Sequence, residues 1–167
     1  MFKCFLRGYN YVVMKRMFVF CFVILICVLG YLLNANFSLN YLSEKSSNYV
    51  ATFSSEINDI NFVGVNNGEL YHVFCLPNNV KYLKEKYNDK VLAETYVLDK
   101  DFDINNFLNR INFKQINQYR IDDKIVVEGY STLLEKYVVT SSRKMNLQIC
   151  IGSNIKIGYP YIAEGFW

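Results

Sequence analysis

The sequence predicts an α+β protein: an N-terminal transmembrane helix followed by one domain with a curved antiparallel sheet and helices on one face. Three observations lead to this prediction. Residues 17–33 contain no charged side chain. Apolar residues at helical spacing occur in the middle of the chain, and strand-like alternation fills its last third. Strands joined by hairpins, with helices set apart from them, are typical of α+β domains.

The uncharged segment at residues 17–33 reads MFVFCFVILICVLGYLL and would form about 26 Å of helix. A bilayer core is about 30 Å thick, so we expect a transmembrane signal-anchor helix over residues 17–36 that contacts the lipid bilayer. The basic residues before it are Lys3, Arg7, Lys15 and Arg16. Positive residues stay in the cytoplasm, which predicts a cytoplasmic tail at 1–16 and an extracytoplasmic domain at 37–167 of a single-pass cell-membrane protein.

The sequence leaves two questions about the N-terminal region open. Ala35 is a candidate for the residue before a signal-peptidase cut, although Leu33 fits position −3 poorly. A cut there would make the same domain a secreted one. Met14 begins MKRMFVF and is a candidate start beside Met1.

The distribution of charge argues against nucleic-acid binding. Four of the 18 Lys and Arg residues precede the uncharged segment, which leaves 14, whereas all 15 Asp and Glu residues follow it. The net charge of residues 37–167 is therefore near −1. Because basic patches supply most non-specific affinity for nucleic acid, we expect no nucleic-acid partner.

An amphipathic helix is the first element expected in the domain, over residues 39–57. Its predicted face has spacings of three and four residues: Leu39, Leu42, Ser46, Tyr49, Phe53 and Ile57. Residues 60–76 then predict a β-hairpin, because Asn67-Gly68 suits the positive φ angles of a type I′ turn. The second hairpin strand is apolar on both faces, so we expect it near the centre of the sheet.

Two more helices and a strand are predicted in the middle of the chain. The first helix follows Pro77 and has one apolar face: Val80, Leu83, Tyr87 and Val91. The segment LAETYVLD is a candidate strand. The second helix is expected to begin at Asp101 or Asp103 as N-cap, before the apolar set Ile104, Phe107, Leu108 and Ile111.

The last third of the chain is predicted to consist of strands. Residues 112–121 and 124–134 flank a turn at Asp122-Asp123. Residues 145–151 alternate most regularly, and the same period resumes at residue 155 after a turn at 152–154. Pro160 cannot donate to a ladder, so it indicates a strand end or a sheet edge.

The C-terminal segments GYSTLL (129–134), MNLQICIGSN (145–154) and IGYPYIAEGF (157–166) carry a family resemblance. They resemble the end of the YwmB-type family of low-GC Gram-positive, mostly spore-forming bacteria. That family tends to close with an asparagine-led strand, a Gly-x-Pro-x-Ile strand and an acidic-aromatic pair. The positions carried over as structural are Gly129, Tyr130, Asn146, Gly158, Pro160, Ile162 and Glu164.

The chain departs from this pattern at two points. Gly165 separates Glu164 from Phe166, and the family's Arg-Tyr after the asparagine-led strand is missing. The resemblance implies a TATA-box-binding-protein-like fold and an exported or membrane-tethered protein. The name of that fold describes a sheet topology and does not imply DNA binding.

Candidate reactive residues lack the partners that chemistry requires. His72 is the only histidine, and Cys75 lies on the opposite face of the same predicted strand. Cys75 and Cys150 can be read either as a disulfide in an oxidising compartment or as buried free thiols. Residues 99–103 read DKDFD, but the glycine and glutamate of a calcium loop are missing, so helix capping explains them better.

No catalytic, cofactor-binding or metal-binding residue is therefore predicted; Ser131-Thr132 also lacks a nucleophile elbow. The 14 Tyr and 13 Phe either fill the core or form a face for a partner. We expect a membrane-tethered, non-catalytic module that binds an unknown envelope protein or ligand, with sporulation as one setting. The alternative is an envelope enzyme of hydrolase type, which a pocket with converging carboxylates and His72 would favour.

Overall fold

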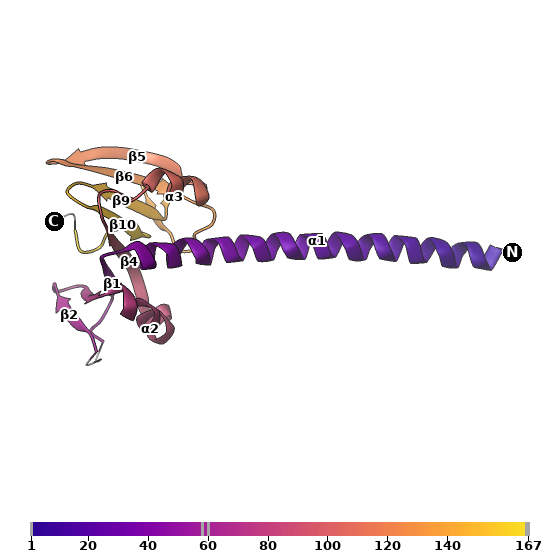
Figure 1. Cartoon of the computed structure of the whole chain (residues 1–167), viewed down its shortest axis with the longest axis horizontal. Coiled ribbons are helices and arrows are strands. Elements are labelled where there is room, and N and C mark those ends of the chain that lie inside the picture. The colour runs from indigo at the N-terminus through magenta and orange to yellow at the C-terminus, as the bar shows by residue number, and fades with distance from the viewer. Residues whose placement is uncertain (1, 58, 60, 166–167) are drawn as a thin grey trace.

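The computed structural model describes the backbone of residues 2–57, 59 and 61–165, and the side chains of residues 16–30, 39–57, 59 and 61–165. The fold is α+β, with an 8-stranded antiparallel sheet in the order β2-β3-β1-β4-β10-β9-β6-β5 (Figure 1). Its strands are β1 (Asn48–Phe53), β2 (Val63–Asn66), β3 (Tyr71–Cys75), β4 (Val91–Leu98), β5 (Lys114–Ile121), β6 (Lys124–Tyr130), β9 (Leu147–Ile151) and β10 (Ile155–Tyr159). The helices are α1 (Phe2–Lys45), α2 (Pro77–Tyr87), the 3-10 helix η1 (Asn88–Lys90) and α3 (Ile104–Arg110). A separate hairpin consists of β7 (Val138–Thr140) and β8 (Arg143–Met145).

The sheet consists of two halves, each built from consecutive parts of the chain. β1 to β4 form one half and β5, β6, β9 and β10 form the other. The two halves join where β10 pairs with β4, from Ile155 opposite Leu98 to Tyr159 opposite Glu94. β4 and β10 therefore lie at the centre of the domain.

The helices pack against one side of the sheet, which we call the helix face; the other side is the outer face. Leu42 of α1, Leu83 of α2 and Phe107 of α3 are all buried in one core cluster. The strands contribute alternate residues to this cluster, such as Tyr49 of β1 and Tyr96 of β4. Alternation along each strand sends the intervening side chains to the outer face.

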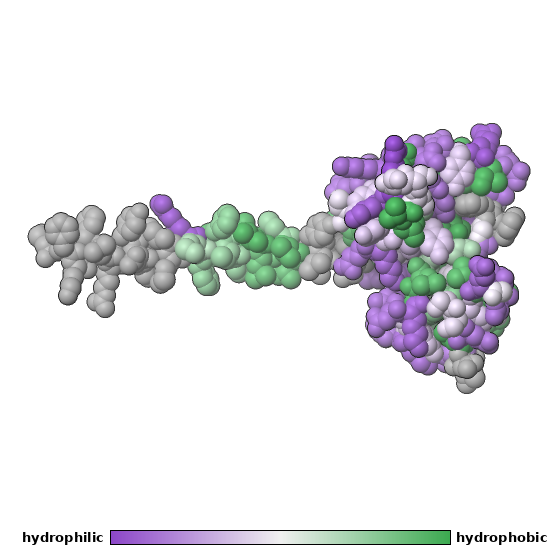
Figure 2. Space-filling view, turned by 180° about the vertical axis from the view of Figure 1, so that it is seen from behind, coloured by the Kyte–Doolittle hydropathy of each residue, from purple (hydrophilic) through white to green (hydrophobic). Residues whose placement is uncertain are grey.

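The predicted transmembrane helix over residues 17–36 is wrong. Among the residues whose side chains are described, no helix has an apolar stretch long enough to cross a membrane. Residues 17–30 of α1 form an uncharged, apolar run whose side chains are described. Figure 2 shows this run projecting from the domain, with Phe18 78% exposed. The side chains of residues 1–15, including the basic Lys3, Arg7 and Lys15, and those of 31–38, which include Leu33 and the possible cut at Ala35, lie outside the described set.

The helix predicted over residues 39–57 is correct only in its first part. α1 ends at Lys45, and β1 begins at Asn48. β1 pairs with β3 on one side and with β4 on the other. Hydrogen bonds to two neighbours outweigh the local apolar spacing, and Val50 and Thr52 suit a strand because they are β-branched.

The hairpin predicted at Asn67-Gly68 is confirmed, but its turn is longer than expected. Asn66 pairs with Tyr71, so four residues connect β2 to β3. Gly68 alone among them has a positive φ angle, and the Asn67 side chain accepts a hydrogen bond from the backbone N–H of Leu70. β3 is the second strand from the sheet edge and not a central one.

The later elements follow the sequence more closely. The predicted turn at Asp122-Asp123 lies between the paired strands β5 and β6, with Asp122 at φ 53°. Pro160 follows the end of β10, which is an interior strand, so it marks a strand end and not a sheet edge. Val91, predicted at the end of a helix, instead begins β4.

Asp103 is the N-cap of α3, because its side chain accepts a hydrogen bond from the backbone N–H of Asn106 at 3.0 Å. We expect Asp103→Ala to lower the free energy of unfolding by about 1 kcal/mol. Asp101→Ala is the matched control, since Asp101 is exposed and does not cap the helix. Urea unfolding of the two variants checks the prediction, and equal effects would contradict it.

Candidate functional site

A polar cavity of about 220 Å³ opens on the helix face where the end of α1, α2, β4 and the segment before β7 meet. It adjoins a hollow of about 650 Å³ between α1 and α2, and Asn40 and Lys84 line both spaces. We call the two together the groove. The inner cavity is further lined by Glu94, Lys136 and Tyr159. Charged side chains of opposite sign thus converge in this part of the domain.

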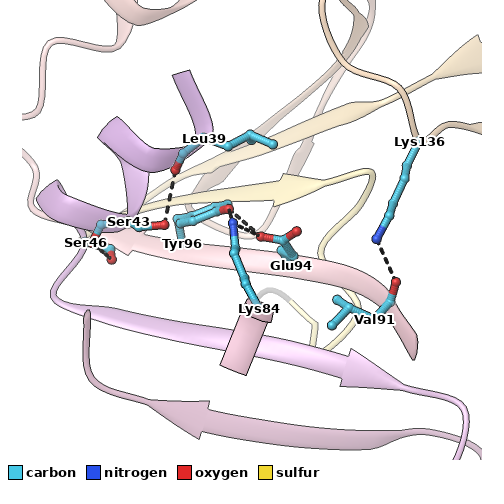
Figure 3. Close-up of polar contacts among 8 residues, drawn as sticks. All are labelled: Leu39, Ser43, Ser46, Lys84, Val91, Glu94, Tyr96 and Lys136. Carbon is cyan, nitrogen blue, oxygen red and sulfur yellow. Dashed lines mark hydrogen bonds and ion pairs between the residues drawn. The ribbon is translucent and has the colours of Figure 1, made fainter. Parts of the chain in front are cut away.

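Glu94 is the buried anion of the groove. It lies on the central strand β4, faces the helices and is 3% exposed. Lys84 of α2 forms an ion pair with it, with Nζ 2.7 Å from Oε2 (Figure 3). The hydroxyl of Tyr96 donates to the same Oε2 and accepts from Lys84 Nζ at 2.8 Å. A buried carboxylate requires this compensation, because desolvation of an unpaired charge costs several kcal/mol.

Two buried tyrosines surround this ion pair. Burial, followed by the negative charge of Glu94, raises the pKa of both Tyr49 and Tyr96 well above the usual value. Lys84 Nζ also lies 5.7 Å from the ring centroid of Tyr49 and 5.4 Å from that of Tyr96. Both phenols therefore keep their protons near neutral pH, and the hydroxyl of Tyr96 donates to Glu94.

Lys136 brings a second ammonium group to the cavity from the opposite side. Its Nζ donates to the carbonyl oxygen of Val91 at 2.9 Å, and its backbone N–H donates to the hydroxyl of Tyr159 at 2.9 Å. Lys84 and Lys136 approach β4 on either side of Glu94 (Figure 3). A lysine has three N–H donors, so each ammonium group retains capacity for a ligand oxygen.

Asn146 supports the wall of this cavity. The side-chain amide of Asn146 donates to the carbonyl oxygens of Ser131 and Leu134, and its Oδ1 accepts from the backbone N–H of Ser131. Leu134 lines the cavity together with its neighbour Leu133. Asn146 thereby holds the segment that leads to Lys136.

The other positions named in the C-terminal resemblance lie in the sheet and in the reversal that follows β10. Gly129 faces the ring of Phe113, where a Cβ atom would lie 2.1 Å from Cζ, and the neighbouring Tyr130 pairs with Lys114. After β10, the cis peptide bond at Pro160 leads the chain across the outer face. Ile162 packs there in the second apolar cluster, and Glu164 accepts a hydrogen bond from Thr95 at 2.7 Å.

His72 lies on the outer face, away from the groove. Its Nδ1 is 3.0 Å from the hydroxyl of Thr52, and its Nε2 is 3.0 Å from the amide nitrogen of Asn67. Oδ1 of Asn67 accepts from the backbone N–H of Leu70, so the amide atom that faces His72 is the nitrogen Nδ2, which is a donor. Nε2 of His72 therefore accepts this hydrogen bond, and Nδ1 carries the ring proton. The histidine is a buried residue with both nitrogens bonded.

The two cysteines of the domain are free thiols and do not form the disulfide considered from the sequence. Cys75 belongs to the helix-face core, whereas Cys150 belongs to the apolar cluster of the outer face. Burial raises the pKa of Cys75 to about 11 and also raises that of Cys150. Both thiols are therefore poor nucleophiles at neutral pH.

Within the described part of the chain, no group of three His, Cys, Asp or Glu side chains is arranged to hold a metal ion. Sequence reasoning missed Lys84, Glu94 and Lys136, which line the inner cavity, and Tyr96, which donates to Glu94. The available signal was Glu94 inside the apolar strand LAETYVL, since an ionised residue there needs a partner. That partner comes from another element, so sequence spacing does not identify it.

Comparisons with models of known protein families, with curated proteins and with solved structures found no match for this chain.

Lys84→Met removes the partner of a buried carboxylate and is expected to destabilise the domain by about 3–5 kcal/mol. Combining Glu94→Gln with Lys84→Met should restore part of the lost free energy of unfolding, because the buried carboxylate without a partner is then removed. Lys81→Met is the control, since its pair with Glu85 is exposed and its loss should cost under about 1 kcal/mol. Chemical unfolding of the single and double variants measures the coupling, and strictly additive effects would contradict the ion-pair assignment.

Gly158 allows the C-terminal reversal to approach the sheet closely. A Cβ atom there would lie 2.3 Å from the carbonyl carbon of Tyr161 and 2.4 Å from the backbone nitrogen of Ile162. We expect Gly158→Ala to lower the free energy of unfolding by about 3 kcal/mol. Gly152→Ala is the control, because the nearest atoms belong to the flexible Lys124 side chain. Similar unfolding midpoints for both variants would disprove the close approach.

Proposed function

We propose that the domain is a non-catalytic binding module that holds a small zwitterionic ligand, of amino-acid or dipeptide size, in the groove. One observation carries this proposal. The ammonium groups of Lys84 and Lys136 meet at one cavity, and its buried carboxylate, Glu94, is already paired. The cavity volume of about 220 Å³ equals the share of roughly seven water molecules in the liquid, which suits a ligand of this size.

The inner cavity is suited to the negative group of such a ligand. Lys84 uses donors toward Glu94 and Tyr96, and Lys136 uses one toward Val91. Their remaining N–H groups can donate to a ligand carboxylate in charge-assisted hydrogen bonds, which are stronger than neutral ones.

The rim of the groove is suited to the positive group. Glu44 and Glu85 line the outer hollow together with Lys81, whose Nζ lies 3.9 Å from Glu85, and Glu135 lines the inner cavity. All three glutamate side chains are exposed, so they lie at the solvent boundary, whereas Glu94 is buried. A ligand with its carboxylate inward and its ammonium group outward would match both sets of charges.

The state of the ionisable groups supports binding more than turnover. Tyr49 and Tyr96 have raised pKa values and keep their protons, so neither phenol is suited to act as a base. Oε2 of Glu94 accepts from both Lys84 and Tyr96, so this oxygen is engaged in contacts within the domain. His72 lies on the other face of the sheet. No observation favours the hydrolase alternative specifically.

Location outside the cytosol remains part of the proposal, and it rests on the basic N-terminal residues and the near-neutral domain. Export through a removed signal does not require a spanning helix. Fractionation of a tagged full chain in a bacterial host, with protease added to cells lacking the outer wall, tests the location. Protection of the domain until lysis would contradict export.

The binding proposal is tested by titrating the full chain with three matched compounds and following backbone amide NMR signals around Lys136 and Glu94. Glycylglycine carries both charges, N-acetylglycine lacks the positive one and glycinamide lacks the negative one. We expect affinity to fall in that order. Lys136→Met should lower the affinity for glycylglycine about 10-fold or more, because a charge-assisted hydrogen bond contributes roughly 1.5–3 kcal/mol.

Lys114→Met is the control for this experiment, since Lys114 is exposed on β5 and does not line the groove. Its affinity for glycylglycine should equal that of the unchanged chain. Equal binding of the three compounds, or equal effects of the two lysine variants, would refute the proposal. Consumption of glycylglycine during the titration would favour the enzyme alternative.

A further inference from the structure

The two edges of the sheet differ in how they are protected against pairing with another strand. β5 forms one edge, and its exposed residues include Lys114 and Arg120, which repel a second copy of the same edge. β2 forms the other edge and reads Val-Gly-Val-Asn, without a charge or a proline. Figure 1 shows β2 at the rim of the domain. Its outward N–H and C=O groups are therefore open to strand addition.

The side chains of this edge add an apolar strip on the outer face. Val63 is 76% exposed and Val65 53% exposed, and both lie on the same face because they are two residues apart. Phe74 of β3, which pairs with Val63, is 47% exposed and extends the strip. Exposed apolar side chains beside an unprotected edge are the features that native proteins usually avoid unless a partner covers them.

The strand is complementary to itself. In an antiparallel pair related by a twofold axis perpendicular to the sheet, opposite residues share a face, so the axis passes midway between one residue and the same residue of the other copy. With Gly64 opposite Gly64, Val63 of one copy faces Val65 of the other, and the converse pair follows by symmetry. Both apolar residues then form cross-strand pairs on the outer face.

Hydrogen bonds already fix the conformation of this edge. His72 links Thr52 of β1 to Asn67 of the turn, and Asn67 in turn accepts from Leu70. The side chain of Asn66 accepts from the backbone N–H of Gly68. A strand held in this way loses little conformational entropy on pairing.

We propose that two copies of the chain associate through β2, antiparallel and with Gly64 opposite Gly64 across the twofold axis, so that the two sheets become continuous. The occupant of the edge is a second copy because an uncharged strand of this sequence matches itself in register and β5 does not. The inference does not depend on the ligand of the groove. Four residues per strand form a small interface, so the association belongs to the transient class and is best detected by crosslinking.

The test uses the full chain with Cys4, Cys21 and Cys27 replaced by serine, leaving the two buried thiols. Val63→Cys and Val65→Cys are prepared with different tags, mixed, and oxidised in air with copper phenanthroline. The proposed register places position 63 opposite position 65 of the other copy. We therefore expect disulfide dimers carrying both tags, in several-fold higher yield than dimers within either variant alone.

Gln118→Cys on β5 is the matched control and should give little dimer. Yields that are equal for like and unlike pairs would overturn the register. If the yield of mixed Val63→Cys and Val65→Cys dimers is no higher than that of the β5 control, a second copy does not pair with β2. Saturable binding of an unrelated extended peptide without dimer formation would also refute the second copy as the partner of this edge.

Discussion

The ion pair between Lys84 and Glu94 is the interaction on which the arrangement of the domain depends. Glu94 occupies a central strand and faces the core, where an uncompensated carboxylate is not tolerated. Its partner comes from α2, so the requirement for compensation holds that helix across β1 and β4. The position of α2 beside the end of α1 leaves the groove between them. One electrostatic constraint therefore shapes both the packing and the cavity.

Local signals in the sequence predicted a large part of the fold. The Asn67-Gly68 dipeptide located the first hairpin, and the apolar alternation after Met145 located β9. Asp103 was one of two candidate caps, and the structure selects it by a direct hydrogen bond. Each of these signals acts over fewer than about eight residues, which is the range over which turn chemistry, capping and side-chain alternation operate.

The errors and omissions have a common physical origin in contacts between distant segments. Tyr49 and Phe53 fit a helical period as well as a strand, and pairing of β1 with both β3 and β4 decided the outcome. The groove was not predicted because Lys84, Glu94 and Lys136 come from three elements. Their approach depends on the strand order and on the path of the chain after β6, which no local pattern in the sequence specifies.

The junction between α1 and β1 has a mechanical consequence. Only Ser46 and Ser47 separate the helix from the strand, and Ser47 is held by hydrogen bonds to the carbonyl oxygen of Val97. Leu42, one turn before the end of α1, is fully buried. The helix therefore has no hinge at its base, and a force or a torque applied along it passes directly into the central strands. The orientation of the domain is therefore coupled to the orientation of the helix.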